Sequence, residues 1–338
     1  MTTATLIHQI DSQLSNQEWL LPDNVAFEDQ HPAPGDCHEE ILQGLKQPQK
    51  IINPKFFYDT RGSALFDQIT HLDEYYLARA EQQILCSYSS EIADLCGQSC
   101  MMIEPGSGSS EKIRLLLNTL RPHLYIPMDI SAAPLRHAAA MLGRQYPWLR
   151  IHAICADFTS TWVLPGELPD GKRVIFYPGS TIGNLEPRNA ITLLLQLRNW
   201  MGDDGGALIG VDLHKPTPRL TAAYNDAAGV TAAFNRNVLH HLNRLLGSDF
   251  DPLAFDHRAH YDDQLQRIEM HLVSRTSHVV NSPYGSFHFA AGETIHTENS
   301  YKYTVEGFSR LAEQAGLRVI RSWLDEERLF SVHYLQQN

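Results

Sequence analysis

Apolar and polar residues alternate in blocks along the middle of the chain. Short apolar runs are followed by amphipathic segments, in which apolar residues recur at helical spacing. The expected strands are MMIEPGSG, LYIPMDI, LRIHAICADF, KRVIFYPGST and GGALIGVDL. The expected helices between them are KIRLLLNTL, SAAPLRHAAAMLGRQYP and PRNAITLLLQLRNWM. Buried strands separated by amphipathic helices predict an α/β fold with a doubly wound parallel sheet.

This pattern stops near His214, where a polar, proline-marked stretch leads into helical sequence. The residues after it alternate as antiparallel strands do, and the tail returns to a helix followed by two strands. We therefore expect a second, discontinuous α+β domain inserted into the first. The expected divisions are an N-terminal arm at 1–36, a second domain at 37–79 and 214–302, and the sheet domain at 80–213 and 303–338.

Composition narrows the classes of protein. The chain has 338 residues, 43% of them apolar, and a formal net charge of -12. An acidic chain without a Lys/Arg-rich run is a poor match for nucleic acid or anionic membranes, so a small-molecule substrate is expected. The five cysteines lack C-x-x-C spacing, and no apolar run is long enough for a membrane span or an export signal. These features predict a cytoplasmic protein, and they leave its oligomeric state open.

The turn GSGSSEK joins an expected strand to an expected helix. It lacks the Gly-Lys-Ser/Thr ending of a phosphate loop, and position 111 is Glu where a dinucleotide fingerprint has its third glycine. Gly106, Ser107 and Gly108 would still let the backbone approach a ligand at a helix N-terminus. A nucleoside with an amino-acid tail fits this turn, with Lys112 either meeting the tail carboxylate or lying in solvent; an ordinary turn without a ligand is the alternative.

Further candidate side chains follow the next strands. Asp129 could accept both hydroxyls of a ribose, Asp157 an exocyclic amine, and Phe158 could cover a base. Gly179 would allow a close backbone approach, and Asn184 would supply an amide. Each of these residues also has an ordinary structural explanation, such as a helix cap or a core ring. Because strand ends meet at one edge of a parallel sheet, together they predict an adenosine site.

Five segments resemble the S-adenosylmethionine-dependent L-histidine Nα-methyltransferases of ergothioneine biosynthesis. They are FFYDTRGSALFDQITHLDEYYLARAE, IEPGSGSSEKIRLLL, YPGSTIGNL, AYNDAAGVTAAFNRNVL and TENSYKY, in consistent order from about Asn53 onward. The resemblance implies a Rossmann-like class I methyltransferase sheet with a second domain over its mouth. It also implies that S-adenosylmethionine is held by Gly106, Lys112, Asp129, Asp157 and Phe158.

The resemblance further implies how an amino-acid substrate is held. Asn184 and Tyr224 would bind its carboxylate, and Glu298 and Ser300 its imidazole, with Tyr75 nearby. The remaining implied contacts are Tyr58 and Phe66 beside the amino group, the backbone carbonyl of Gly179, and Met270 along the side chain. Tyr58, Gly179 and Asn184 are the expected catalytic positions.

Three functions stay open at this stage. The first is an enzyme that trimethylates the α-amine of L-histidine to hercynine. The second is an N-methyltransferase of the same fold that acts on another aromatic amino acid or an indole derivative, and the third is a cofactor-binding regulatory module without turnover. The 17 histidines contain no H-x-x-x-H with a carboxylate partner, so no metal site is expected.

Overall fold

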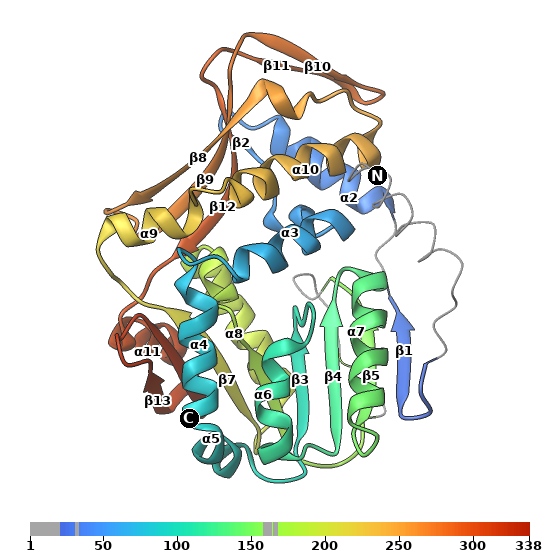
Figure 1. Ribbon diagram of the computed structural model, residues 1–338, viewed down its shortest axis with the longest axis vertical. Helices are drawn as coiled ribbons and strands as arrows, with labels where there is room; N and C mark the ends of the chain where they lie inside the picture. Colours follow the sequence, from blue (N-terminus) through green and yellow to red (C-terminus); the bar gives the residue numbers. More distant parts are fainter. Residues whose placement is uncertain (1–20, 31–33, 158–163, 165–167) are drawn as a thin grey trace.

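An eight-stranded sheet forms the larger part of the computed structural model, which describes residues 21–30, 34–157, 164 and 168–338 (Figure 1). Its strand order is β1-β5-β4-β3-β6-β7-β14-β13, with β14 antiparallel to β7 and β13 antiparallel to β14. The other pairs are parallel. The strands are β1 (Val25–Asp29), β3 (Met101–Pro105), β4 (Leu124–Asp129), β5 (Arg150–Cys155), β6 (Arg173–Tyr177), β7 (Gly206–Asp212), β13 (Leu317–Leu324) and β14 (Phe330–Gln337).

Helices cover both faces of this sheet, which explains why its central strands are apolar throughout. All residues of β3 and β7 are buried. One face packs against α4 (Tyr76–Ser87), α5 (Ser89–Cys96), α6 (Glu111–Leu120) and α7 (Ala132–Gln145), and the other against α8 (Pro187–Met201) and α11 (Val305–Gln314). Strand order reverses between β3 and β6, and in open α/β sheets ligands bind at such a reversal, beyond the carboxyl ends of the strands.

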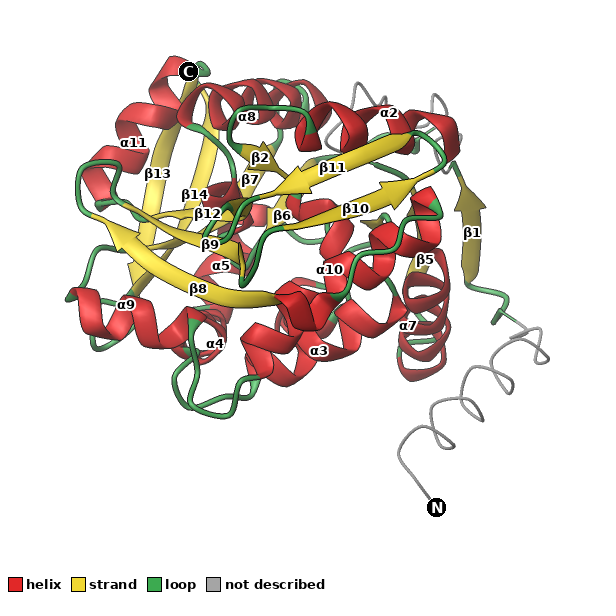
Figure 2. Ribbon diagram, turned by 90° about the horizontal axis from the view of Figure 1, so that it is seen from above, coloured by secondary structure: helices red, strands yellow, loops and turns green. Residues whose placement is uncertain are grey.

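A second module lies over those carboxyl ends (Figure 1). Its four-stranded sheet has the order β2-β12-β9-β8, and a separate β10–β11 hairpin lies beside it (Figure 2). The strands are β2 (Lys50–Ile51), β8 (Phe255–Asp262), β9 (Arg267–Ser274), β10 (His278–Ser282), β11 (Gly285–Phe289) and β12 (Thr294–Tyr301). The helices are α2 (Pro34–Leu45), η1 (Pro54–Phe57), α3 (Thr60–Thr70), α9 (Thr217–Tyr224), α10 (Val230–Leu246) and η3 (Pro252–Ala254).

The chain leaves the main sheet and returns to it at adjacent points. After β7, Leu213 forms an isolated parallel bridge with Tyr303, which follows β12. The Tyr303 N–H donates to the Asp212 carbonyl at 3.0 Å, and the His214 N–H donates to the Tyr303 carbonyl at 3.0 Å. The inserted segment is therefore tied at its base by backbone hydrogen bonds.

Two expectations about boundaries need correction. The residues at 25–29, expected in a peripheral arm, form β1, which pairs in parallel with β5 at the sheet edge. Only Val25 of this strand is buried, so its sequence lacks the apolar run that marks the central strands. Helix α4 also continues through the boundary expected at 79/80. Within the described residues, no helix is both long and apolar enough to cross a membrane.

Candidate functional site

Backbone hydrogen bonds to the neighbouring strand β4 fix the position of the glycine turn after β3. Gly106 and Gly108 have positive φ angles of 71° and 51°, which glycine adopts without strain. The N–H groups of Gly106 and Ser107 both donate to the Met128 carbonyl, at 2.8 and 2.9 Å. A Cβ added to Gly108 would meet nothing within 4 Å, and the buried Ser107 hydroxyl has no partner in the described part of the protein. The turn thus presents free space and an unsatisfied polar atom, which fits a polar ligand.

Asp129 fixes this turn and remains able to bind a ligand. Its Oδ2 accepts from the Gly108 N–H at 3.0 Å, and its Oδ1 accepts from the Ser131 N–H at 2.9 Å. Burial raises the pKa of Asp129, although these backbone donors oppose the shift. A carboxylate has about four acceptor sites, so both oxygens can still accept hydrogen bonds from ribose hydroxyls.

Lys112 has a partner that the sequence did not reveal. Its Nζ lies 2.7 Å from Glu81 Oε2, and the Gly179 N–H donates to both oxygens of Glu81 at 2.9 and 3.0 Å. Glu81, on α4, is almost fully buried, whereas a third of the Lys112 side chain is exposed. Glu81 therefore links the first turn of α6 to the loop that contains Gly179, and Lys112 keeps donors for a carboxylate.

Asp157 also has a basic partner. Lys55 Nζ lies 2.7 Å from Asp157 Oδ2 and 2.7 Å from Glu40 Oε2, so this lysine links the second module to the end of β5. Phe158, expected to cover the base, lies outside the described residues. The expected role of Asp157 toward adenine stays a prediction.

A row of aromatic rings runs from the end of η1 through α3 and the start of α4 to the end of α9. Tyr58 meets Phe66 edge to face at 5.6 Å between ring centroids, and Phe66 meets Tyr75 at 6.3 Å. Tyr75 in turn meets Tyr224 at 6.2 Å. Phe234 of α10, which the sequence analysis missed, contacts both Tyr58 and Phe66. The structure thus brings together four tyrosines and phenylalanines that were expected in the substrate site.

Glu298 lies at a position that makes its carboxyl group a weaker acid than usual. It lies opposite Met270 in the β12–β9 pairing, next to a bulge between 296 and 298. Burial raises the pKa of Glu298 to about 7, against the attraction of Lys302. The charge of Glu298 in turn contributes to raising the pKa of Tyr58 and of Tyr75, for which burial is the main cause. The carboxyl group therefore shares one poorly hydrated space with these rings.

A buried polar network that the sequence did not reveal lies beneath Ser300 and Tyr224. Lys302 Nζ reaches the Asp212 carboxylate at 2.7 Å, the Ser300 hydroxyl at 2.8 Å and the Tyr224 hydroxyl at 3.0 Å, which occupies all three ammonium hydrogens. Burial would raise the pKa of Asp212, but Lys302 and Lys215 hold it below its usual range. Its other oxygen pairs with Lys215 at 2.6 Å.

This network limits what the two hydroxyls can offer. Ser300 and Tyr224 lie 2.7 Å apart, so one hydroxyl donates to the other, and both oxygens already accept from Lys302. One hydroxyl hydrogen is left to donate to a ligand. A ligand that takes a hydrogen from both groups must open their mutual contact.

Asn184 ends a short 3₁₀ helix, η2 (Thr181–Asn184), that packs tightly on β12. A Cβ on Gly183 would come within 2.9 Å of the Tyr301 carbonyl, so no other residue fits there without movement. Ser180, just before η2, adopts a left-handed φ of 56° that is uncommon outside glycine, and such strain clusters at functional sites. Asn184 thereby lies at the junction of the two modules.

The comparisons with known proteins agree with this geometry. Residues 37–337 match the family model described as "Histidine-specific methyltransferase, SAM-dependent". The chain is 44% identical over 293 residues to a histidine N-alpha-methyltransferase of Mycolicibacterium smegmatis, covering 85% of this chain and 90% of that protein. It is 42% identical to the Mycobacterium tuberculosis protein of the same name, with the same coverage of both chains.

A third relative is longer than this chain. Ergothioneine biosynthesis protein 1 of Neurospora crassa is 30% identical over 279 residues, which cover 79% of this chain and 31% of that protein. In the main sheet, β14 lies between β7 and β13 and is antiparallel to both. The chain belongs to the histidine-specific, S-adenosylmethionine-dependent methyltransferases.

Proposed function

We propose that the protein trimethylates the α-amino group of L-histidine to hercynine, as a step of ergothioneine biosynthesis. The choice of acceptor rests on two side chains of β12. Glu298 has a pKa raised to about 7, and Ser300, two residues further along the strand, carries a hydroxyl. A carboxylate and a hydroxyl can satisfy the two ring nitrogens of an imidazole, whereas an indole has only one N–H. Buried polar groups that stay unpaired strongly disfavour the wrong substrate.

The cofactor site is proposed at the glycine turn. Gly106, Ser107 and Gly108 would hold the methionine part, Lys112 its carboxylate and Asp129 the ribose; Asp157 and Phe158 would contact the base. S-adenosylmethionine supplies an electrophilic methyl group on a sulfonium. The open space at Gly108 and the unpartnered Ser107 hydroxyl support this placement.

The chain's own residues have mainly to position the amine. Transfer requires a neutral amine lone pair, aligned with the methyl group and shielded from water. Asn184 and Tyr224 would anchor the substrate carboxylate, and Met270 would contact the side chain. Because Ser300 is also proposed to donate to the imidazole, the 2.7 Å contact between the Ser300 and Tyr224 hydroxyls would open when the substrate binds. Burial keeps the Tyr58 hydroxyl protonated by raising its pKa well above the usual value, so its oxygen can accept a hydrogen bond from the amine without adding a charge.

The product carries a fixed positive charge, which the aromatic lining suits. Tyr58 and Phe66 meet edge to face, and Tyr75 continues the row. A cation beside such ring faces gains about 0.5–2 kcal/mol. The Gly179 carbonyl would direct the amine, while its N–H is held by Glu81. The site therefore favours a substrate that becomes cationic as it is methylated.

The two parts of the fold are proposed to bind different ligands. We propose that 37–79 and 214–302 act as the substrate-binding part and 80–213 with 303–338 as the cofactor-binding part, with the corrections at β1 and α4 given above. We further propose a cytoplasmic enzyme that acts on a small molecule and not on nucleic acid or membranes.

The direct test is a methyl-transfer screen. The protein is incubated with methyl-labelled S-adenosylmethionine and each proteinogenic amino acid in turn, and label in the amino-acid fraction is counted. Label in histidine alone is expected. Equal label in tryptophan would favour the indole-type acceptor, and binding of the cofactor without transfer to any acceptor would favour a regulatory module.

A further inference from the structure

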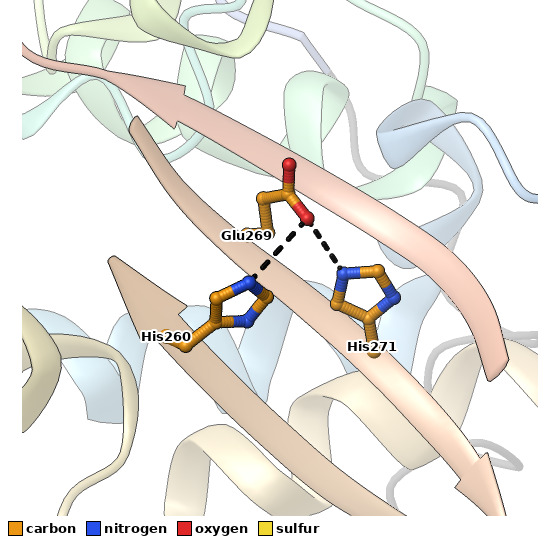
Figure 3. Close-up of side chains that lie close together, drawn as sticks. All are labelled: His260, Glu269 and His271. Carbon is orange, nitrogen blue, oxygen red and sulfur yellow. Dashed lines mark hydrogen bonds and ion pairs between the residues drawn. The ribbon is translucent and has the colours of Figure 1, made fainter. Parts of the chain in front are cut away.

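Three side chains on two paired strands of the second module converge on one point. His260 of β8 and Glu269 of β9 are direct cross-strand partners, and His271 follows two residues after Glu269 on the same face. Their candidate ligand atoms all lie within 4.8 Å of one another (Figure 3). His271 Nε2 lies 2.9 Å and His260 Nε2 3.7 Å from Glu269 Oε2. The cluster lies beside the substrate face of β9 but points the other way, because Met270 between the two β9 residues faces the opposite side.

We propose that His260, Glu269 and His271 form a site for a divalent first-row transition-metal ion such as Zn²⁺. Two imidazole nitrogens and one carboxylate oxygen are a recognised donor set for zinc, with a fourth position left for water. Ligands about 2.0–2.1 Å from a tetrahedral ion lie roughly 3.3–3.5 Å apart, so the observed separations need only small side-chain movements. Imidazole ligands favour zinc, copper, nickel or iron over magnesium and calcium.

The carboxylate is already oriented for this role. The Nε of Arg267 donates to Glu269 Oε1 at 2.8 Å, and its Nη2 lies 2.5 Å from the same oxygen, which leaves Oε2 to face the two histidines. Hydrogen bonds to ligating carboxylates are typical of metal sites, because they fix the ligand's orientation. The guanidinium also offsets part of the carboxylate's charge, which should weaken binding relative to a site with an unpaired carboxylate.

The imidazoles can present the required nitrogen. The Nδ1 atoms of His260 and His271 are buried and have no hydrogen-bond partner in the described structure. No protein hydrogen bond at Nδ1 therefore has to break when the ring hydrogen moves there. The His271 Nε2 contact with Glu269 Oε2 at 2.9 Å would be replaced by bonds from both atoms to the ion. The His260 side chain is 44% exposed, so an ion and its water can enter from solvent on that side.

Sequence spacing could not reveal this cluster. Its members come from two antiparallel strands, and no H-x-x-x-H pattern marks them. The expectation of no metal site rested on that pattern, whereas the β8–β9 register creates the convergence.

The test measures metal binding without reference to activity. Untagged protein competes with a chromophoric indicator for Zn²⁺ near pH 7.5, and Glu269→Gln, His260→Ala and the control His288→Ala, at an exposed histidine of β11, are compared with the unaltered chain. The unaltered chain and the control should each bind one equivalent, at least tenfold more tightly than Glu269→Gln or His260→Ala. Co²⁺ bound at the same site should give the visible spectrum of a four-coordinate ion, and excess Mg²⁺ should not displace it.

Two outcomes would overturn the proposal. Equal zinc affinity and stoichiometry in all four proteins would mean that binding is spread over the chain's other histidines. Displacement by Mg²⁺ would remove the assignment to a transition metal. Because His260 is partly exposed, its loss is compatible with folding, and matched circular dichroism spectra of the four proteins check this.

Discussion

At the scale of single residues, Glu298 is the group that we propose separates histidine from other amino acids. Burial raises the pKa of this carboxyl group to about 7, and its charge contributes to raising the pKa of Tyr75. The sequence marked this residue only through the family resemblance. No feature of TENSYKY by itself distinguishes a partly buried carboxyl group from a fully solvated one.

The first prediction concerns specificity. Glu298→Ala should lower kcat/KM for histidine by roughly tenfold to a hundredfold, because it removes a charged hydrogen-bond acceptor worth about 1.5–3 kcal/mol. The same change should lower kcat/KM for tryptophan much less, because an indole has only one ring nitrogen and does not match the Glu298 and Ser300 positions as an imidazole does. Asn184→Ala is the matched variant. It should lower kcat/KM for both amino acids alike if Asn184 holds the substrate carboxylate. Initial rates for both amino acids in both variants would decide; an unchanged histidine-to-tryptophan ratio in Glu298→Ala would rule out a role in reading the side chain.

The second prediction concerns pH. The pKa of Glu298 is raised in the fold from an ordinary value of 4.5 to about 7, so the folded state binds this proton more tightly than the unfolded state. Its contribution to stability is therefore complete below about pH 4.5 and is lost as the pH rises through about 7. Glu298→Gln should be more stable than the unaltered chain at pH 8 by up to about 3 kcal/mol, since one pKa unit corresponds to about 1.4 kcal/mol.

Urea unfolding at pH 8 and pH 5 provides the measurement, with the difference expected to shrink at the lower pH. The same substitution should reduce methyl transfer to histidine, so stability and activity change in opposite directions. A glutamine variant that is less stable at pH 8 would show that the Glu298 carboxylate is well satisfied in the fold, contrary to this account.

At the scale of elements, the Asp212–Lys302 pair joins the end of β7 to the residue just after β12. Both side chains are fully buried, with Nζ and Oδ2 2.7 Å apart. Removing one member of a buried ion pair leaves the other charge uncompensated, at a cost of about 3–5 kcal/mol. Because Lys215 still pairs with Asp212 at 2.6 Å, Lys302→Met should destabilise the fold by the lower end of this range, about 3 kcal/mol. It also leaves the Ser300 and Tyr224 hydroxyls without their common donor.

Thermal unfolding of Lys302→Met is compared with Arg275→Ala as its control. The Arg275–Asp256 ion pair links the bend just after β9 to β8, but both of its side chains are more than half exposed. Its loss should therefore change the melting temperature little. Similar melting temperatures for the two variants would mean that the buried network does not hold the modules together.

A further prediction at this scale concerns the β3–α6 turn. Asp129→Ala removes the acceptor of the Gly108 and Ser131 N–H groups and the proposed ribose contact. We expect S-adenosylmethionine to bind roughly a hundredfold more weakly, which corresponds to about 3 kcal/mol. Calorimetric titration of the cofactor measures this directly, and unchanged affinity would move the ribose elsewhere.

At the scale of the whole molecule, the strands of the main sheet could be predicted well from the sequence, whereas the ion pairs between distant segments could not. Periodicity suffices for the central strands, because buried parallel strands read as continuous apolar runs. It missed β1, whose edge position leaves it mostly polar, and it missed Glu81, Asp212, Lys302 and Lys55. Each of these charged residues has at least one charged partner more than 30 residues away in the chain, so only the fold reveals that pairing.

The site itself forms where the inserted module meets the carboxyl ends of the main sheet. Its expected residues come from both parts, and the bridge between Leu213 and Tyr303 holds the base of the insertion. The glycine turn could be predicted from local sequence. The substrate side depended on the family resemblance, because aromatic residues at helical spacing are typical of any core.

The central claim is the threefold methylation of histidine on its α-nitrogen. The most direct measurement is mass spectrometry of the product formed from L-histidine and excess S-adenosylmethionine, with fragmentation to locate the added groups. We predict a final product with three methyl groups on the α-nitrogen, formed together with three equivalents of S-adenosylhomocysteine. Unmodified histidine, or methyl groups on the imidazole ring, would contradict the account.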